Sequence, residues 1–302
     1  MSCSCDAPFS NIGANPCKDL RKVARRFILV PEFDSAGDKN TIATIADVTK
    51  SALQAKFDAS AIADRWFPTP QFENVESIRA DAVVQEFNSG KSAKVRDGVR
   101  SMTVFFPLQG NLWMGKLEKF ECVSVGFYEI DADGNFIYSK CPTDDAVDPI
   151  LIEDGTMDIE YINATDSEVS MVKMTFDIRL SEKDAEQRYI ASSELDFDAL
   201  SSSDLYSLYD VSSVNSSITT ETATVALTTD FGVKVGGLLE GDFALYNITA
   251  SSAVTIASFT ESSKGVYVFT FTAQTSADVI RVTPVKAKFD FSLVVANTIE
   301  IP

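Results

Sequence analysis

The sequence predicts a mainly β protein: an antiparallel sheet or barrel-like domain with one or two flanking helices, followed by a β-sandwich at the C-terminal end. Residues 79–108 have the pattern of one long antiparallel ribbon, and residues 169–180 alternate between polar and apolar side chains. After residue 210 the chain consists of short apolar runs separated by turns. The composition changes near Val211, which places the predicted domains at residues 1–210 and 211–302.

The ribbon at residues 79–108 is the element around which the first domain is predicted to form. Its turn is Asn88-Ser89-Gly90-Lys91; a two-residue loop there would place Val84 opposite Val95, and a longer loop would shift that register. The return arm alternates between an apolar and a basic set of side chains, Ala93, Val95 and Val99 against Lys94, Arg96 and Arg100. This pattern predicts a strand with one face in water, whereas the apolar run 102–106 predicts burial on both faces.

A ribbon with a mixed tip and an apolar root can anchor in a sheet while its tip contacts another subunit. The predicted inter-subunit assembly residues are the apolar side chains of this ribbon: Val83, Val84, Phe87, Val95 and Val99. The alternative is an ordinary hairpin that stays within one domain.

The remainder of the first domain is predicted to be strands with a few helices. A first strand at residues 27–30 stops at Pro31, and residues 41–66 have helical spacing, with a second short helix closed by Ile62, Trp66 and Phe67. Strands are expected over residues 112–130, 150–152, 157–162 and 169–180, and short helices over 181–189 and 196–209. Asp133-Gly134 predicts a hairpin; a calcium-binding loop starting at Asp131 is excluded because its sixth and twelfth positions are Phe136 and Pro142.

The C-terminal region is predicted to contain six or seven short strands after a Ser-rich linker at residues 212–220. Residues 223–227 and 266–271 alternate, and Phe289, Phe291, Leu293 and Val295 are expected in a last long strand. This strand count resembles an immunoglobulin-like (Ig-like) sandwich, without the Cys and Trp hallmarks.

Charge and composition argue against several classes of function. The net charge is −18, from 26 basic and 44 acidic residues, so tight binding to a phosphate backbone is not expected. The chain has no histidine and no nucleotide-binding or nucleophile-elbow motif, so no catalytic residue, cofactor or enzyme activity is predicted. No apolar segment is long enough to span a membrane, and the first residues lack the apolar core of a signal peptide, so folding in the cytoplasm is expected.

Three of the five cysteines, Cys3, Cys5 and Cys17, lie near the N-terminus, where they could form part of a metal site. A fourth ligand would have to be Cys122 or Cys141, far along the chain, so reduced thiols without a metal are the prediction.

Several segments together resemble the tail tube proteins, or major tail proteins, of tailed bacteriophages. The shared layout is an N-terminal arm, a strand, a helix, a long ribbon and a run of antiparallel strands that ends at Leu180. The segments RRFILVPEF, RWFPTP and YEIDADGNF, with the Cys-rich start, are similar to chains of Bacteroidetes phages and prophages. A C-terminal Ig-like domain is also common in such proteins.

The resemblance implies a virion protein, assembled in the host cytoplasm, that closes into hexameric rings, which stack into the tail tube. Its partners would be copies of itself, joined by the ribbon and the N-terminal arm, and sheath or tail-tip and tape-measure proteins. DNA would pass through an acidic lumen that repels phosphate, without tight nucleic-acid binding. The alternatives are another virion protein, such as a decoration or tail-tip subunit, or a bacterial surface adhesin or pilin-like module.

Overall fold

The structure, a computed structural model, describes residues 21–140 and 145–302. It divides into two compact units, Met1–Tyr206 and Ser207–Pro302, and the division lies four residues before the predicted domain boundary. Antiparallel sheets dominate both units, so the predicted mainly β class is confirmed. Each unit is described by itself below.

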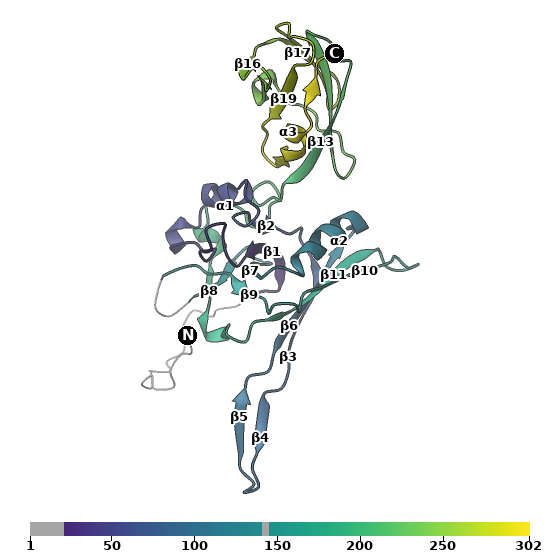
Figure 1. Cartoon of the computed structure of the whole chain (residues 1–302). Coiled ribbons are helices and arrows are strands. Elements are labelled where there is room, and N and C mark those ends of the chain that lie inside the picture. The colour runs from purple at the N-terminus through teal and green to yellow at the C-terminus, as the bar shows by residue number, and fades with distance from the viewer. Residues whose placement is uncertain (1–20, 141–144) are drawn as a thin grey trace. The chain divides into compact units, whose positions relative to one another are not determined.

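The described residues of the first unit form two antiparallel sheets, two α-helices and a projecting ribbon (Figure 1). One sheet has the order β12-β8-β7-β1-β2, with β9 paired to β7; its strands are β1 (Ala24–Pro31), β2 (Phe67–Pro68), β7 (Val125–Asp131), β8 (Phe136–Ser139), β9 (Ile150–Leu151) and β12 (Gln187–Ile190). The other has the order β10-β11-β6-β3, with β3 (Glu73–Arg79), β6 (Arg100–Pro107), β10 (Asp158–Ile162) and β11 (Met171–Ile178). Neither sheet closes within the described residues, so the first unit is built from open sheets and not from a barrel.

Aromatic side chains between the two sheets form the core of the first unit. The ring of Phe127 lies 4.7 Å from that of Phe27 and 5.2 Å from that of Phe176, which belongs to the other sheet. The predicted alternation of β11 is confirmed, because its inward set is buried: Val172, Met174, Phe176 and Ile178. On β6 only alternate residues are fully buried, so the prediction of burial on both faces there is wrong.

The sheet that contains β1 and β7 is covered on both faces. Its second face carries Tyr128, whose ring lies 5.1 Å from Trp66 and 4.9 Å from Phe136. This double burial explains why β1 and β7 are nearly continuous apolar runs. The predicted hairpin follows β7: Asp131 Oδ1 accepts hydrogen bonds from the backbone N–H groups of Asp133 (2.9 Å) and Asn135 (3.0 Å).

Several predicted helices and strands of the first unit are wrong. Helix α1 (Lys50–Phe57) forms, but the second helix does not, since Trp66 is buried in a connection and Phe67 begins β2. The strand predicted from residue 112 is replaced by α2 (Asn111–Leu117) and a 3₁₀ turn before β7. Residues 181–189 form a 3₁₀ turn and β12, and residues 196–206 contain no helix. Across the described residues, no helix has the length and apolar character needed to cross a membrane.

The second unit is a sandwich of two sheets with one short α-helix, α3 (Ser292–Ala296), and a 3₁₀ turn at Glu240–Asp242. The first sheet, in the order β17-β18-β14-β13-β20, comprises β13 (Tyr209–Ser216), β14 (Thr222–Thr229), β17 (Ile256–Ser263), β18 (Val266–Phe271) and β20 (Phe289–Asp290). The second, in the order β16-β15-β19-β21, comprises β15 (Phe243–Asn247), β16 (Ser252–Val254), β19 (Val279–Pro284) and β21 (Ile299–Glu300). Phe243 joins them, with its ring 5.2 Å from Tyr267 and 5.0 Å from Phe269.

The sandwich differs from its prediction in three respects. It has nine strands and not six or seven. The predicted Ser-rich linker is mostly strand β13, because Val211 is buried and residues 211–216 pair with β14. The predicted last long strand is split into β20 and α3, which leaves Leu293 exposed and Val294 buried.

Candidate assembly surface

The ribbon is formed by β4 (Val83–Glu86) and β5 (Ser92–Arg96), which continue from β3 and lead back into β6 (Figure 1). It extends away from the two sheets of the first unit, and every residue of both strands is exposed. The prediction that only one face of the return strand is in water is therefore wrong for the single chain, because both faces are exposed. An isolated two-stranded hairpin is marginally stable in water, so this element gains stability from any partner that covers it.

The turn of the ribbon is longer than the two-residue loop considered from the sequence. The backbone N–H of Phe87 donates to the carbonyl of Lys91 (2.8 Å), which leaves three residues in the loop, with Gly90 at a φ of +76°. The register shifts accordingly: Val84 lies opposite Lys94 and not opposite Val95. A shift of one residue turns side chains to the other face of a strand, so the pairing decides which apolar groups act together.

The observed register gathers most of the predicted assembly residues on one face. Val84, Glu86, Ser92 and Lys94 share the first face, since directly paired residues project to the same side. The second face, which we call the apolar ribbon face, carries Val83, Phe87, Ala93 and Val95, with the polar Gln85 and the basic Arg96, which pairs with Val83, among them. Val95 is the extra residue of a β-bulge, and Val83, Phe87 and Val95 are 43%, 48% and 61% exposed. The apolar ribbon face carries no acidic side chain.

Val84 and Val99, the other two predicted assembly residues, lie elsewhere. Val84 is 51% exposed on the opposite face of the ribbon. Val99 is half-buried at the joint between β5 and β6, where its carbonyl accepts a hydrogen bond of 2.9 Å from the N–H of Ala80. Val99 therefore contributes to the base of the ribbon and not to its exposed tip.

The joint at the base requires a glycine. A Cβ atom at Gly98 would lie 1.6 Å from the carbonyl oxygen of Ala80 and 2.9 Å from that of Asp81. The two strands thus cross at a separation that only glycine permits. This close approach sets the direction in which the ribbon leaves the sheet.

Ion pairs hold the root of the ribbon to the first unit. Arg79, at the end of β3, forms an ion pair of 2.7 Å with Asp184, and Arg100, at the start of β6, pairs with the same carboxylate. Arg100 also donates to the carbonyl of Glu182 (2.7 Å), and burial lowers the pKa of its guanidinium. Both strands that carry the ribbon are therefore fastened at one point.

Leu108, just after β6, is a feature that sequence reasoning did not single out. It is the most exposed large apolar residue described, at 76%, and its φ is +61°. Its N–H donates to the carbonyl of Ser170 (3.0 Å), which brings it beside Val169, and Leu112 follows in the first turn of α2. Val169 and Leu112 are each 50% exposed. The one sequence signal is an apolar residue between Pro107 and the Gln109-Gly110 turn.

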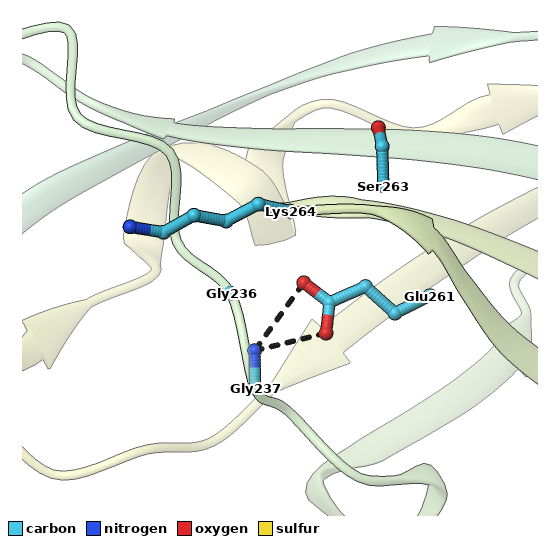
Figure 2. Close-up of a pocket in the computed structure, with 5 residues that line it drawn as sticks. All are labelled: Gly236, Gly237, Glu261, Ser263 and Lys264. Carbon is cyan, nitrogen blue, oxygen red and sulfur yellow. Dashed lines mark hydrogen bonds between the residues drawn. The ribbon is translucent and has the colours of Figure 1, made fainter.

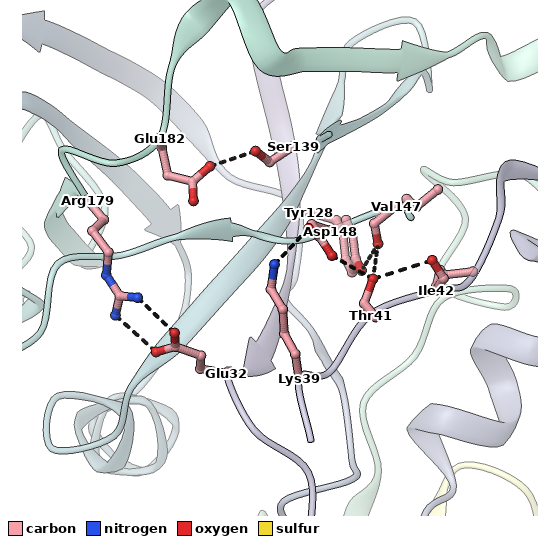
Figure 3. Close-up of polar contacts among 10 residues, drawn as sticks. All are labelled: Glu32, Lys39, Thr41, Ile42, Tyr128, Ser139, Val147, Asp148, Arg179 and Glu182. Carbon is pink, nitrogen blue, oxygen red and sulfur yellow. Dashed lines mark hydrogen bonds and ion pairs between the residues drawn. The ribbon is translucent and has the colours of Figure 1, made fainter. Parts of the chain in front are cut away.

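A polar cluster in the first unit contains half-buried carboxylates, but it is already satisfied (Figure 3). Asp148 accepts from Lys39 Nζ and from Thr41 Oγ1, each at 2.7 Å. Glu182 accepts from Ser139 Oγ at 2.7 Å, and burial raises the pKa of its carboxyl group. Because these carboxylates accept hydrogen bonds from donors of their own unit, the cluster ties connections of the chain to the sheet.

A surface hollow of the second unit has a similar explanation (Figure 2). It is lined by Gly236, Gly237, Glu261, Ser263 and Lys264. The Glu261 carboxylate accepts from the N–H groups of Gly237 (3.1 Å) and Gly265 (2.8 Å), and these bonds lower its pKa. The carboxylate therefore fastens a loop to the β17–β18 hairpin.

No group of three or more Cys, Asp or Glu side chains placed to hold a metal occurs in residues 21–140 and 145–302. Cys122 is a free, exposed thiol. Cys3, Cys5, Cys17 and Cys141 lie outside the described residues, and so do the thiolate cluster considered from the sequence and the N-terminal arm.

Comparison with known proteins identifies no relative: no family model, no curated protein and no solved structure matches the chain.

Proposed function

We propose that the chain is a structural subunit that assembles with copies of itself through the apolar ribbon face. The assembly we propose is the tail tube of a tailed bacteriophage, built from stacked, hexameric rings. The observation that carries the proposal is the projecting ribbon, on which every residue of both strands is exposed and one face carries Val83, Phe87 and Val95.

The energetics of the ribbon support a partner. Full burial of an exposed Val or Phe side chain contributes about 1.5–3 kcal/mol. Because Val83, Phe87 and Val95 are each about half exposed, covering them contributes roughly 3 kcal/mol per contact. Each ring contains several such contacts, and each subunit of a tube meets more than one neighbour, so a modest contact becomes a stable assembly through multivalency.

The charge of the chain also suits a conduit for DNA. Forty-four acidic residues against 26 basic ones give a net charge of −18, and an acidic lumen repels phosphate. DNA would therefore pass without binding tightly. On this proposal the protein belongs to the virion tail, with sheath or tail-tip and tape-measure proteins as further partners, and with the β-sandwich of the second unit available for contacts on the outside.

The test is negative-stain electron microscopy of the full-length protein over a range of concentration and salt, with Val95→Asp and Ser92→Asp compared with the wild type. Both substitutions introduce Asp at an exposed position of β5, but only Val95 lies on the apolar ribbon face. We expect rings or hollow tubes for the wild type and Ser92→Asp, and folded monomers for Val95→Asp. Circular dichroism checks that all three are folded.

Two results would contradict the proposal. A wild-type protein that stays monomeric at every concentration and salt would favour a decoration protein or an adhesin module. Tubes that form equally well with Val95→Asp would show that the apolar ribbon face is not the contact.

A further inference from the structure

We propose that the apolar ribbon face of one copy docks on the opposite end of the same sheet in the next copy, at Leu108, Leu112 and Val169. This inference rests on the proposed self-assembly and names the partner surface. We call these three residues the acceptor patch.

The backbone of Leu108 gives the first argument. A leucine at φ +61° is strained, because its Cβ crowds the backbone, and its side chain is 76% exposed. In the single chain this residue therefore carries a backbone cost without the gain of burying an apolar side chain. Strain of this kind points to a functional contact, and a partner that covers Leu108 supplies the missing burial.

The position of the patch gives the second argument. The ribbon leaves its sheet at Arg100, the first residue of β6, whereas Leu108 follows Pro107, the last residue of that strand (Figure 1). Eight residues at about 3.3 Å each place Leu108 about 26 Å from the root of the ribbon, and the apolar ribbon face lies beyond that root. Two different surfaces at opposite ends of one strand make a heterologous, head-to-tail contact, which generates closed rings or open stacks of subunits.

Charge gives the third argument, because the two surfaces have opposite signs. Residues 83–96 contain three basic side chains, Lys91, Lys94 and Arg96, and one acidic side chain, Glu86; Lys94 is paired with Asp97, so the charge complementarity rests on Lys91 and Arg96. Residues 163–170, which end in the acceptor patch, contain the exposed Asp166 and Glu168 and no basic residue. A basic ribbon is unusual in a chain of net charge −18, and it complements this acidic loop.

Substitution of the patch itself is the first test. Leu108→Asp places a charge on the acceptor patch, and its backbone is compatible, since Asp tolerates positive φ better than Leu does. We expect this variant to stay folded and to raise the protein concentration at which polymers appear at least tenfold. The matched control is Ile62→Asp, which alters another exposed apolar side chain of the first unit and should assemble like the wild type.

A mixing experiment then tests the head-to-tail arrangement. Val95→Asp retains an intact acceptor patch, and Leu108→Asp retains an intact ribbon. Each variant alone should be monomeric at concentrations where the wild type polymerises, whereas an equimolar mixture treated with a chemical cross-linker should give a one-to-one dimer and no larger species, because only one junction is intact. Cross-linking is needed because a single contact of roughly 3 kcal/mol dissociates readily when it is not repeated around a ring. A mixture that remains monomeric overturns the inference.

Charge exchange gives an independent readout. The double variant Lys91→Glu/Arg96→Glu should lose assembly, and adding Asp166→Lys/Glu168→Lys to the same chain should restore it. Failure of this restoration contradicts the charge pairing. If the wild type assembles and Leu108→Asp assembles equally well, the acceptor patch is wrong but the proposed function stands; a wild type that never assembles overturns both.

Discussion

Gly98→Ala perturbs the joint of the ribbon without touching its exposed face. The new Cβ would lie 1.6 Å from the carbonyl oxygen of Ala80, whereas side-chain carbons essentially never approach closer than 3.0 Å. The strands must therefore separate by more than 1 Å, which breaks the 2.9 Å hydrogen bond from Ala80 N–H to the carbonyl of Val99. We expect a redirected ribbon, because the crossing at Gly98 sets its direction.

The magnitude follows from the lost hydrogen bond and the strain of the displaced backbone. A hydrogen bond contributes about 0.5–1.5 kcal/mol and overpacking costs about 1–3 kcal/mol, so Gly98→Ala should lower the free energy of unfolding by about 1.5–4.5 kcal/mol. For a unit of this size each kcal/mol corresponds to about 2–4 °C in Tm. Assembly should be lost in addition, since a redirected ribbon no longer reaches its partner surface.

Three measurements check this prediction: the Tm, the hydrogen-exchange protection of the Ala80 amide, and polymer formation by electron microscopy. Gly241→Ala is the matched control, because a Cβ at that position meets no atom within 4 Å. If Gly98→Ala matches this control in all three measurements, the joint does not set the direction of the ribbon and the reasoning is refuted.

Three further predictions concern stability. Arg26→Leu should lower the free energy of unfolding in urea by about 3–5 kcal/mol, because the buried guanidinium donates to the carbonyls of Thr69 and Ser201 and its removal leaves them unpaired. The exposed Arg188→Leu should lower it by less than about 1 kcal/mol. Burial raises the pKa of the Glu182 carboxyl group in the folded protein, so the wild type loses stability as pH rises through that pKa and the group becomes charged. Glutamine stays neutral, so the Tm of Glu182→Gln should increase relative to that of the wild type between pH 4 and pH 8. Glu261→Gln should do the opposite: the pKa of Glu261 is lowered by backbone hydrogen bonds, so the substitution should lower Tm at pH 7 and lower it less at pH 3, because this contribution to stability is lost as pH falls through the folded-state pKa. The same Tm difference at both pH values would contradict either titration argument.

Local patterns predicted the elements whose environment is simple. The alternation in β11 identified its inward face, because one side packs on the core and the other does not. Asp133-Gly134 identified the β7–β8 hairpin, because the turn is stabilised by its own residues around Asp131. Both signals act within a few residues, so distant contacts did not alter them.

Predictions failed where a distant contact selects between similar local patterns. The segment that forms α2 was predicted as a strand, because a short apolar run is compatible with either state; Trp113 packs its ring 4.8 Å from Phe106 in the helical state. The end of the chain likewise became β20 and α3, because Val294 is buried in the core while Leu293 is exposed.

The candidate surface shows the same division. The sequence alone identified the ribbon, its apolar side chains, its basic return arm and the acidic character of the chain, because these are properties of composition and of a period-two pattern. Only the tertiary structure decided that Val83, Phe87 and Val95 share one face while Val84 lies on the other, because a three-residue loop and a bulge set the register. Only the structure also revealed Leu108 at the far end of β6, since exposure and a positive φ depend on how the chain is packed around that residue and cannot be read from its type.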